Sequence, residues 1–242
     1  VTNLEKLVEY LPNVRTASRG PGISSIYIRG LSTDTAGAQI LGVAGVQPNV
    51  CAVSNDLKVD DVKGWVAAMK KDPGKYNYSS TGVGSMSHLS VEIVKLKSDS
   101  YAVHLPYASS PLAILAIMQG DVQFACVPPV AVMPQAKAGK LKAIAVTSAK
   151  RSKLAPELPT MAESGFPDIQ ALAWMAIMAP AKTPPDIINR MSKEISAILA
   201  EPETQQKLAV AYMESVGSTP EELAKWMVEE RDRWAPVIKH AG

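Results

Sequence analysis

The strongest constraint on the fold is a regular alternation of strand and helix patterns that runs from about residue 50 to residue 180. Short apolar runs, such as 50–54 and 122–127, alternate with helical patterns that start at capping residues such as Asp61. Strands joined by helices favour parallel pairing, with the helices covering the faces of the sheet. The sequence therefore predicts an α/β fold with parallel-rich sheets.

The predicted elements fall into three stretches of different texture. Residues 4–11 have a short helical pattern and residues 25–29 alternate like a strand, whereas the Gly-, Ala- and Thr-rich stretch 30–45 has weak periodicity. In the middle stretch, strands are predicted at 50–54, 76–80, 101–107, 122–127, 141–147 and 174–179, and helices from residue 60 or 61 and at 85–97, 110–119 and 130–138. Three further helices are predicted to begin near residues 184, 202 and 220, where Pro or a capping box marks the first turn.

Composition excludes several classes of function. The 242 residues are 47% hydrophobic and carry a formal net charge of +2, so a large core is possible and no basic surface for nucleic acid is indicated. No apolar run approaches the ~18 residues of a membrane-spanning helix, so direct membrane insertion is not expected. Cys51 and Cys126 lack the spacing of a zinc site. We expect two half-buried thiols, with a disulfide as the alternative, and neither a metal nor a cofactor.

A loop rich in serine and glycine, residues 79–88, joins one predicted strand to the next helix. Its small residues would let a ligand approach the backbone, and the free N–H groups and dipole of the following helix favour negative charge there. It lacks the lysine of a phosphate-binding P-loop and the glycine spacing of a dinucleotide site. We predict capture of a carboxylate or another small anion, with an ordinary turn as the alternative. The candidate residues are Ser80, Thr81, Gly82, Gly84 and Ser85.

A second loop, residues 107–111, has the same character: it follows a predicted strand, carries hydroxyls and opens a helix. Its candidate residues are Tyr107, Ser109 and Ser110. Ligands of open α/β sheets bind at the carboxyl ends of the strands, which is where both loops are expected. We predict that the two loops lie on two lobes and hold a small anion between them. A simple turn is again the alternative.

An enzyme is the main alternative that these residues raise. Ser85 and His88 are three positions apart at a helix start and could touch, which suggests a Ser/His hydrolase. The flanking residues lack the pattern of a nucleophile elbow, and no acidic partner is evident. We therefore expect no enzymatic activity, and we expect His88 to bond the loop or the neighbouring strand.

Several segments, in order along the chain, carry a resemblance to a known family. They are Asp72–Tyr78, Ser80–His88, His104–Tyr107, Lys137–Ser148, Leu158–Gly165 and Ala179–Pro184. From about residue 48 to residue 242, the sequence resembles the Bug-type substrate-binding proteins of tripartite tricarboxylate transporters. The resemblance implies a two-lobed periplasmic binding protein of the type II fold. Such a protein captures a small carboxylate, such as a di- or tricarboxylate, for membrane transporter subunits and catalyses no reaction.

The resemblance also implies lobe boundaries. Residues 51–102 and 173–242 would form the first lobe and residues 103–172 the second, with the chain crossing back near Trp174. By position, the loop after residue 79 would supply ligand contacts on the first lobe and the loop after residue 106 on the second. The sequence departs from the family at Ala108 and Ser109, where members often have a basic residue and a glycine, and at Val127, where an Asp is frequent.

Residues 1–50 are predicted to be an atypical segment. The family's first βα unit, whose Pro-x-Gly-Gly loop contributes to the carboxylate clamp, is not found there, so an incomplete first lobe and weak affinity are expected. Leu11–Val14, Gly20–Gly22 and Tyr27–Ser32 resemble part of the plug domain of TonB-dependent outer-membrane receptors. We favour a fused segment, with a divergent N-terminus of the binding protein as the alternative. A fragment of such a receptor is a second functional alternative, although no barrel-strand pattern follows residue 50.

Overall fold

The computed structural model describes residues 14–18, 24–28, 38–180 and 182–241. The chain divides into two compact units. One contains the described residues up to Val46 together with Trp174–Glu230, and the other contains Gln47–Ala173 and the end of the chain from Arg231. The two units are described separately below.

The unit that begins at Gln47 is built on a five-stranded sheet with the order β6-β5-β7-β4-β8. Its strands are β4 (Val50–Val53), β5 (Asn77–Ser80), β6 (Val103–Pro106), β7 (Phe124–Val127) and β8 (Lys142–Val146). Strand β5 runs parallel to both β6 and β7, as the alternation of strands and helices predicts. Strand β4 runs antiparallel to both of its neighbours, which the alternation did not predict.

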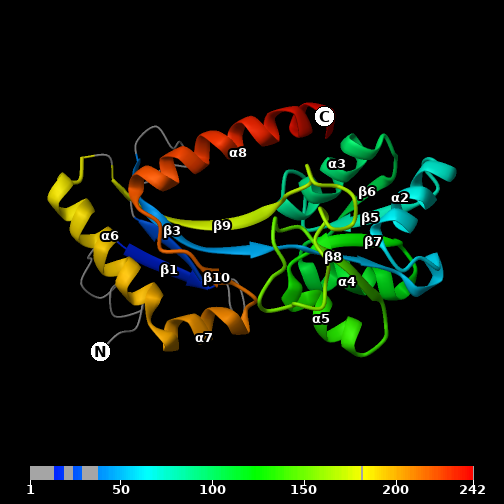
Figure 1. Cartoon of the computed structure of the whole chain (residues 1–242), viewed down its shortest axis with the longest axis horizontal. Coiled ribbons are helices and arrows are strands. Elements are labelled where there is room, and N and C mark those ends of the chain that lie inside the picture. Colours follow the sequence, from blue (N-terminus) through cyan, green and yellow to red (C-terminus); the bar gives the residue numbers. More distant parts are fainter. Residues whose placement is uncertain (1–13, 19–23, 29–37, 181, 242) are drawn as a thin grey trace. The chain divides into compact units, whose positions relative to one another are not determined.

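Helices cover both faces of this sheet (Figure 1). They are α2 (Val62–Lys71), α3 (Met86–Ser98), α4 (Ser110–Gln119) and α5 (Pro129–Lys137). Helix α3 packs on β5 and β7 from one side, and α4 packs on the same strands from the other. Local sequence sets the ends of these helices, because Asp61 caps α2 through a 2.7 Å bond from Gly64 N and the left-handed Gly120 closes α4.

A large hydrophobic cluster of this unit contains buried residues of α2 and α3. Trp65 of α2 meets Phe124 of β7 edge to face, with ring centroids 5.0 Å apart. Cys51 and Cys126 lie opposite each other on β4 and β7, are buried, and form a disulfide. The expectation of two free thiols is therefore wrong. The pairing depends on the register of two strands that are 75 residues apart, which spacing in the sequence does not reveal.

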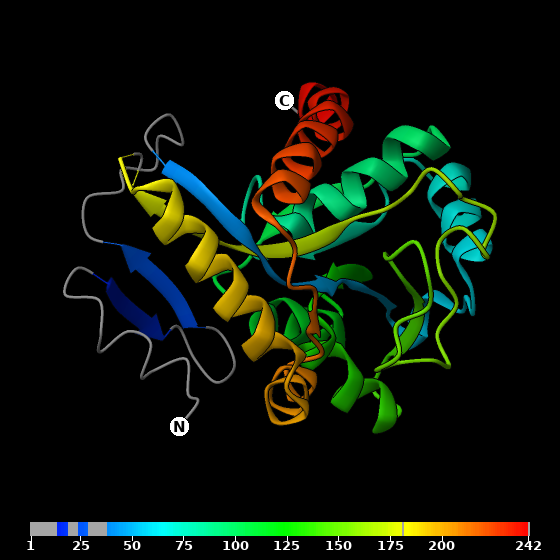
Figure 2. The same cartoon turned by 60° about the vertical axis from the view of Figure 1, so that its left-hand side comes forward.

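The other unit is smaller and contains a β-hairpin and a three-stranded sheet. The hairpin pairs β1 (Val14–Ser18) with β2 (Ser24–Ile28), and the sheet has the order β10-β3-β9. The remaining elements are β3 (Ala38–Pro48), β9 (Leu172–Pro180), β10 (Glu214–Ser215), α6 (Pro185–Ala200), α7 (Pro202–Val210) and α8 (Pro220–Ala241). Helix α6 packs its apolar face on β3 and β9 through Ile188, Ile195 and Leu199 (Figure 2). The last residues of α8 belong to the core of the first-described unit.

The structure corrects the predicted lobe boundary at residue 102/103. Strands β5 and β6 lie on either side of that boundary but are paired in one sheet, with Tyr78 opposite His104. Residues 51–102 therefore share a unit with residues 103–172. Strand β3 was also missed, because its run of small residues has no clear periodicity. The helix predicted at 4–11 lies outside the described residues.

Candidate functional site

The serine- and glycine-rich loop connects the end of β5 to the start of α3. Ser85 is the N-cap of α3, in extended conformation, and its hydroxyl accepts a 3.3 Å hydrogen bond from His88 N. Gly82 and Gly84 have φ angles of +126° and +74°, which residues with a side chain rarely adopt. A Cβ atom at either position would meet nothing within 4 Å, so backbone conformation rather than space requires glycine there.

The hydroxyls of this loop hold the loop itself. Ser85 Oγ donates to Gly82 O at 2.6 Å, and Ser87 Oγ accepts a 2.9 Å bond from Thr81 N. Ser80 Oγ accepts from Gly82 N at 3.1 Å. The hydroxyls that the sequence proposes as ligand donors, those of Ser80, Thr81 and Ser85, thus all have partners within or beside the loop. A ligand would have to share them.

The second loop lies beside the first. Tyr107 N donates to Ser80 O at 2.9 Å, which extends the β5–β6 pairing by one residue past the strand ends. Ser109 is the N-cap of α4, and its hydroxyl accepts a 3.5 Å bond from Leu112 N. Both loops therefore lie at the carboxyl edge of one parallel strand pair, in one unit. The prediction that they lie on two lobes is wrong, because β5 and β6 are neighbours in one sheet.

The backbone donors at this edge have few protein acceptors. Within the described part of the chain, no acceptor is found for the N–H groups of Val83, Met86 and Ser87 in the first loop, or for those of Ala108, Ser109 and Ser110 in the second. Met86 and Ser87 occupy the first two positions of α3, where the helix offers no internal acceptor and its dipole is positive. Val83 is 79% exposed. This arrangement offers donors to a negatively charged group from solvent.

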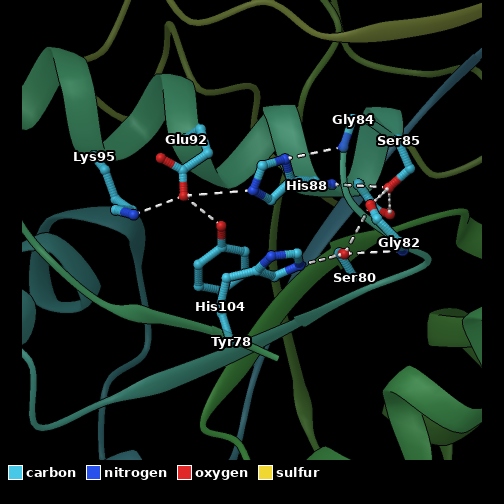
Figure 3. Close-up of polar contacts among 10 residues, drawn as sticks. Tyr78, Ser80, Gly82, Gly84, Ser85, His88, Glu92, Lys95 and His104 are labelled. Atoms are coloured by element: carbon cyan, nitrogen blue, oxygen red, sulfur yellow. Dashed lines mark hydrogen bonds and ion pairs between the residues drawn. The ribbon is translucent and has the colours of Figure 1, made fainter. Parts of the chain in front are cut away.

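Two histidines lie directly beneath the first loop (Figure 3). His88 of α3 turns its Nδ1 toward the loop and accepts a 3.3 Å hydrogen bond from Gly84 N. His104 of β6 places its Nε2 2.6 Å from Ser80 Oγ. The two imidazole rings are 4.2 Å apart between centroids, and Tyr78 stacks on His104 at 4.8 Å. The expectation that His88 bonds the loop is confirmed.

A buried ion pair between Glu92 and Lys95 is also part of this cluster. Glu92 Oε1 accepts a 2.6 Å hydrogen bond from Lys95 Nζ and a further bond from the Tyr78 hydroxyl, and it lies 3.9 Å from His88 Nε2. Burial by itself would raise the pKa of the Glu92 carboxyl, but the hydrogen bonds from Lys95 and Tyr78 hold that pKa below its ordinary value. Burial raises the pKa of the Tyr78 hydroxyl, and its bond to Glu92 adds to that effect.

Both histidines are held neutral at ordinary pH. Burial lowers the pKa of His88, and burial together with the neighbouring His88 lowers the pKa of His104 to about 4. A neutral His88 can accept from Gly84 N only through an unprotonated Nδ1, so its ring proton lies on Nε2, on the side of Glu92. His88 therefore presents an acceptor to the first loop and its ring proton to the side of Glu92.

This geometry argues against the Ser/His hydrolase. The Ser85 hydroxyl donates to Gly82 O, and the ring of His88 accepts from a backbone N–H, so the two side chains do not form a nucleophile–base pair. Ser80 does contact His104, but Ser80 is fully buried and lies out of reach of a substrate. Within the described residues, no group of three His, Cys, Asp or Glu side chains could hold a metal ion. No described helix is both long enough and apolar enough to cross a membrane.

Sequence reasoning missed the supporting residues Tyr78, Ser87, Glu92, Lys95 and His104. One signal was available, because Tyr78 and Ser80 alternate along a strand and so face the same side, toward α3. His104 joins them only through the β5–β6 register, which the sequence does not display. The spacing of Glu92 and Lys95 is typical of an exposed ion pair on a helix, although in the structure both side chains are buried.

Comparison with known proteins places the chain in a family. Residues 37–242 match the family described as "Tripartite tricarboxylate transporter family receptor". Protein BugT of Bordetella pertussis is 30% identical over 202 residues, which make up 84% of this chain and 62% of BugT. Among solved structures, R. palustris Rpa4515 with adipate has 27% sequence identity and a TM-score of 0.76, and it is matched over 87% of this chain and 71% of that chain. Periplasmic binding protein BugD has 27% identity and a TM-score of 0.71, over 85% of this chain and 69% of its own.

These matches settle part of what the sequence suggested. They confirm the α/β fold of the periplasmic binding proteins and a family of receptors rather than enzymes. The family match starts at residue 37, so the atypical segment is shorter than the predicted 1–50, and the resemblance to a TonB-dependent plug domain finds no support. The chain spans less than two thirds of the length of BugT. By its match over residues 37–242, the chain belongs to the family of tripartite tricarboxylate transporter receptors.

Proposed function

We propose that this protein is a periplasmic solute-binding protein that captures a small dicarboxylate and delivers it to the membrane subunits of a tripartite tricarboxylate transporter. The ligand carboxylate would bind at the carboxyl edge of β5 and β6, where the first and second loops meet. Family membership and the adipate complex of Rpa4515 support the ligand class. The geometry of that edge supports binding of a carboxylate there.

The observation that carries the proposal is the adjacency of two helix N-termini, at each of which several backbone donors have no acceptor among the described residues. The bond from Tyr107 N to Ser80 O fixes the two loops side by side. Residues 78–89 and 104–114 contain no Lys or Arg, so backbone amides and helix dipoles must provide the attraction for an anion. Such a site recognises a carboxylate without fixing the length of the carbon chain, which suits binding of dicarboxylates of several lengths.

Ligand contacts are proposed for the backbone N–H groups of Ser109 and Ser110 and for the Tyr107 side chain. Gly82, Gly84 and Ser85, whose N–H groups already donate to Ser80 Oγ, His88 Nδ1 and Gly82 O, are proposed to shape the first loop. Ser80 and Thr81 contribute by holding the loop, since their hydroxyls are already bonded. Val83, Met86 and Ser87 are added to the candidates because their N–H groups lack acceptors among the described residues. The experiment below separates these contributions amide by amide.

The test is a titration of ¹⁵N-labelled protein with adipate, followed in two-dimensional amide spectra. This measurement detects millimolar as well as tight binding and locates it on the chain. We expect saturable shifts at Val83, Met86, Ser87 and Ser110, and the same pattern with a dicarboxylate of different length. Adipamide, which has the same carbon chain without the charges, is the control and should leave these resonances in place. Saturable shifts confined to other residues, or no shifts at all, would refute the proposal.

A further inference from the structure

The two histidines beneath the first loop hold both of its left-handed glycines. His88 Nδ1 accepts directly from Gly84 N, at 3.3 Å. His104 acts through Ser80, whose hydroxyl lies 2.6 Å from His104 Nε2 and accepts from Gly82 N at 3.1 Å. The two glycines are where the loop takes positive φ angles, so these two contacts fix its shape (Figure 3).

The charged groups around His88 and His104 do not stabilise a positive charge on both imidazole rings. The titratable and charged groups that face the histidines are Tyr78 on β5 and Glu92 and Lys95 on α3. The Glu92 carboxylate is already engaged by Lys95 and by the Tyr78 hydroxyl, so it is not free to compensate two more positive charges. The two rings, 4.2 Å apart, would repel each other if both were charged.

We infer that His88 and His104 are positioning residues that keep the first loop in its anion-binding shape only while both imidazoles are neutral. Protonation of His88 at Nδ1 places an N–H against the N–H of Gly84, and the contact must break. The first loop then loses the bond that fixes Gly84, and the donors of Val83, Met86 and Ser87 lose their alignment. This inference rests on the proposed function for its ligand, but its structural part does not.

Linkage gives the direction of the effect on ligand binding. If the ligand binds only the form with neutral histidines, saturation with ligand must lower the pKa of each imidazole further. A bare electrostatic effect of a nearby anion would raise these pKa values instead. The two explanations therefore predict opposite signs. Below the lower pKa, the apparent Kd should rise roughly tenfold per pH unit for each proton that is released on binding.

The first experiment needs no ligand. The chain has three histidines, so each imidazole can be titrated individually by NMR together with the amides of Gly82 and Gly84. We expect the Gly84 amide to shift with the pKa of His88 and the Gly82 amide with that of His104. The third histidine, His240, is exposed near the end of α8. Glycine amides that do not follow either titration would overturn the inference, whatever the outcome with adipate.

The second experiment uses variants and adipate. His88→Ala removes the acceptor for Gly84 N and should weaken adipate binding, whereas His88→Asn places an amide oxygen near the Nδ1 position and should recover most of the affinity. The His88→Asn protein should also lose the extra pH dependence, and only the protonation of adipate, which is common to both proteins, should remain. His240→Asn is the matched control. If adipate fails to bind at any pH, the proposed function fails while the glycine titration still decides the inference. If wild type and His88→Asn share one pH profile, the inference fails alone.

Discussion

The two helix starts at the carboxyl edge of the sheet look alike in sequence but are built differently. Both have a serine N-cap and small residues around it. The first loop is fixed by two left-handed glycines, a chain of hydroxyl bonds and two buried histidines. The second loop has one side-chain cap at 3.5 Å and a proline at the second helical position. Preorganisation of backbone donors therefore comes from what lies beneath a loop and not from the loop's composition.

The largest loss of stability should appear when Glu92, which supports the cluster beneath the first loop, is replaced. Glu92→Ala leaves Lys95 buried without its carboxylate and Tyr78 without its acceptor, so we expect a loss of about 3–5 kcal/mol in the free energy of unfolding, measured with urea. Glu203→Ala breaks an exposed pair with Lys207 and should leave the free energy of unfolding nearly unchanged.

Amide spectra of the folded Glu92→Ala protein sharpen this comparison. The resonances of the first loop should shift, while those of the second loop should not. The second loop leads into α4, which is held by its own buried apolar residues, such as Ile114 and Ile117. A cost below about 1 kcal/mol would mean that Glu92 and Lys95 do not hold the cluster together. Equal shifts in both loops would mean that the two helix starts share one support.

A proline scan compares the two sets of donors directly. Met86→Pro removes the N–H at the first position of α3, where proline suits the helix and the preceding Ser85 already has a compatible extended backbone. If that N–H binds the carboxylate, the loss should be about 1.5–3 kcal/mol, or roughly 10- to 100-fold in Kd for adipate, measured by titration.

The matched control is Met86→Ala, which removes the half-buried side chain but keeps the N–H. Ser110→Pro makes the equivalent change at the first position of α4, and we expect a smaller loss because the second loop is less constrained. Equal affinities of Met86→Pro and Met86→Ala would exclude the Met86 amide as a ligand contact. A larger loss for Ser110→Pro would reverse the ranking of the two loops.

The sequence predicts the local parts of this arrangement well and the long-range parts poorly. The bounds of α4 were predicted as Ser110–Gln119, and Asp61, one of the two residues predicted as the cap of α2, is its N-cap, because capping and periodicity are local. The antiparallel direction of β4, the disulfide of Cys51 and the position of His104 depend on strand register between distant segments. The hydroxyls of the first loop were predicted to be ligand donors, but their bonds to one another, to Ser87 and to His104 are seen only in the fold.

The dependence of stability on pH tests the buried side of the first loop. Burial and His88 hold the pKa of His104 at about 4, below the ~6.5 of an unfolded chain, so the unfolded state takes up this proton first as the pH falls. The stabilisation is therefore complete above about pH 6.5 and is lost between about pH 6.5 and 4. Because His104 is partly exposed, we expect a loss on the order of 1 kcal/mol from this group.

The control for this prediction is His104→Gln, whose side-chain amide can still bond Ser80 but does not titrate. Urea midpoints measured between pH 4 and pH 7 should fall less steeply for this variant than for the wild type. Parallel curves for the two proteins would show that His104 is not held neutral by the fold. Ser109→Ala leaves His104 and Ser80 unchanged and should keep the wild-type slope.

The two N-caps should differ in their contributions to stability. Ser85→Ala removes the bond to His88 N and the 2.6 Å bond to Gly82 O, so we expect a cost of about 1–2 kcal/mol in the free energy of unfolding. Ser109→Ala removes only a 3.5 Å contact with Leu112 N and should cost about 0.5 kcal/mol. Threonine at either position retains a hydroxyl cap and serves as the control. Equal costs would mean that the Ser85 bond to Gly82 adds nothing, and the first loop would then be held from below by the histidines alone.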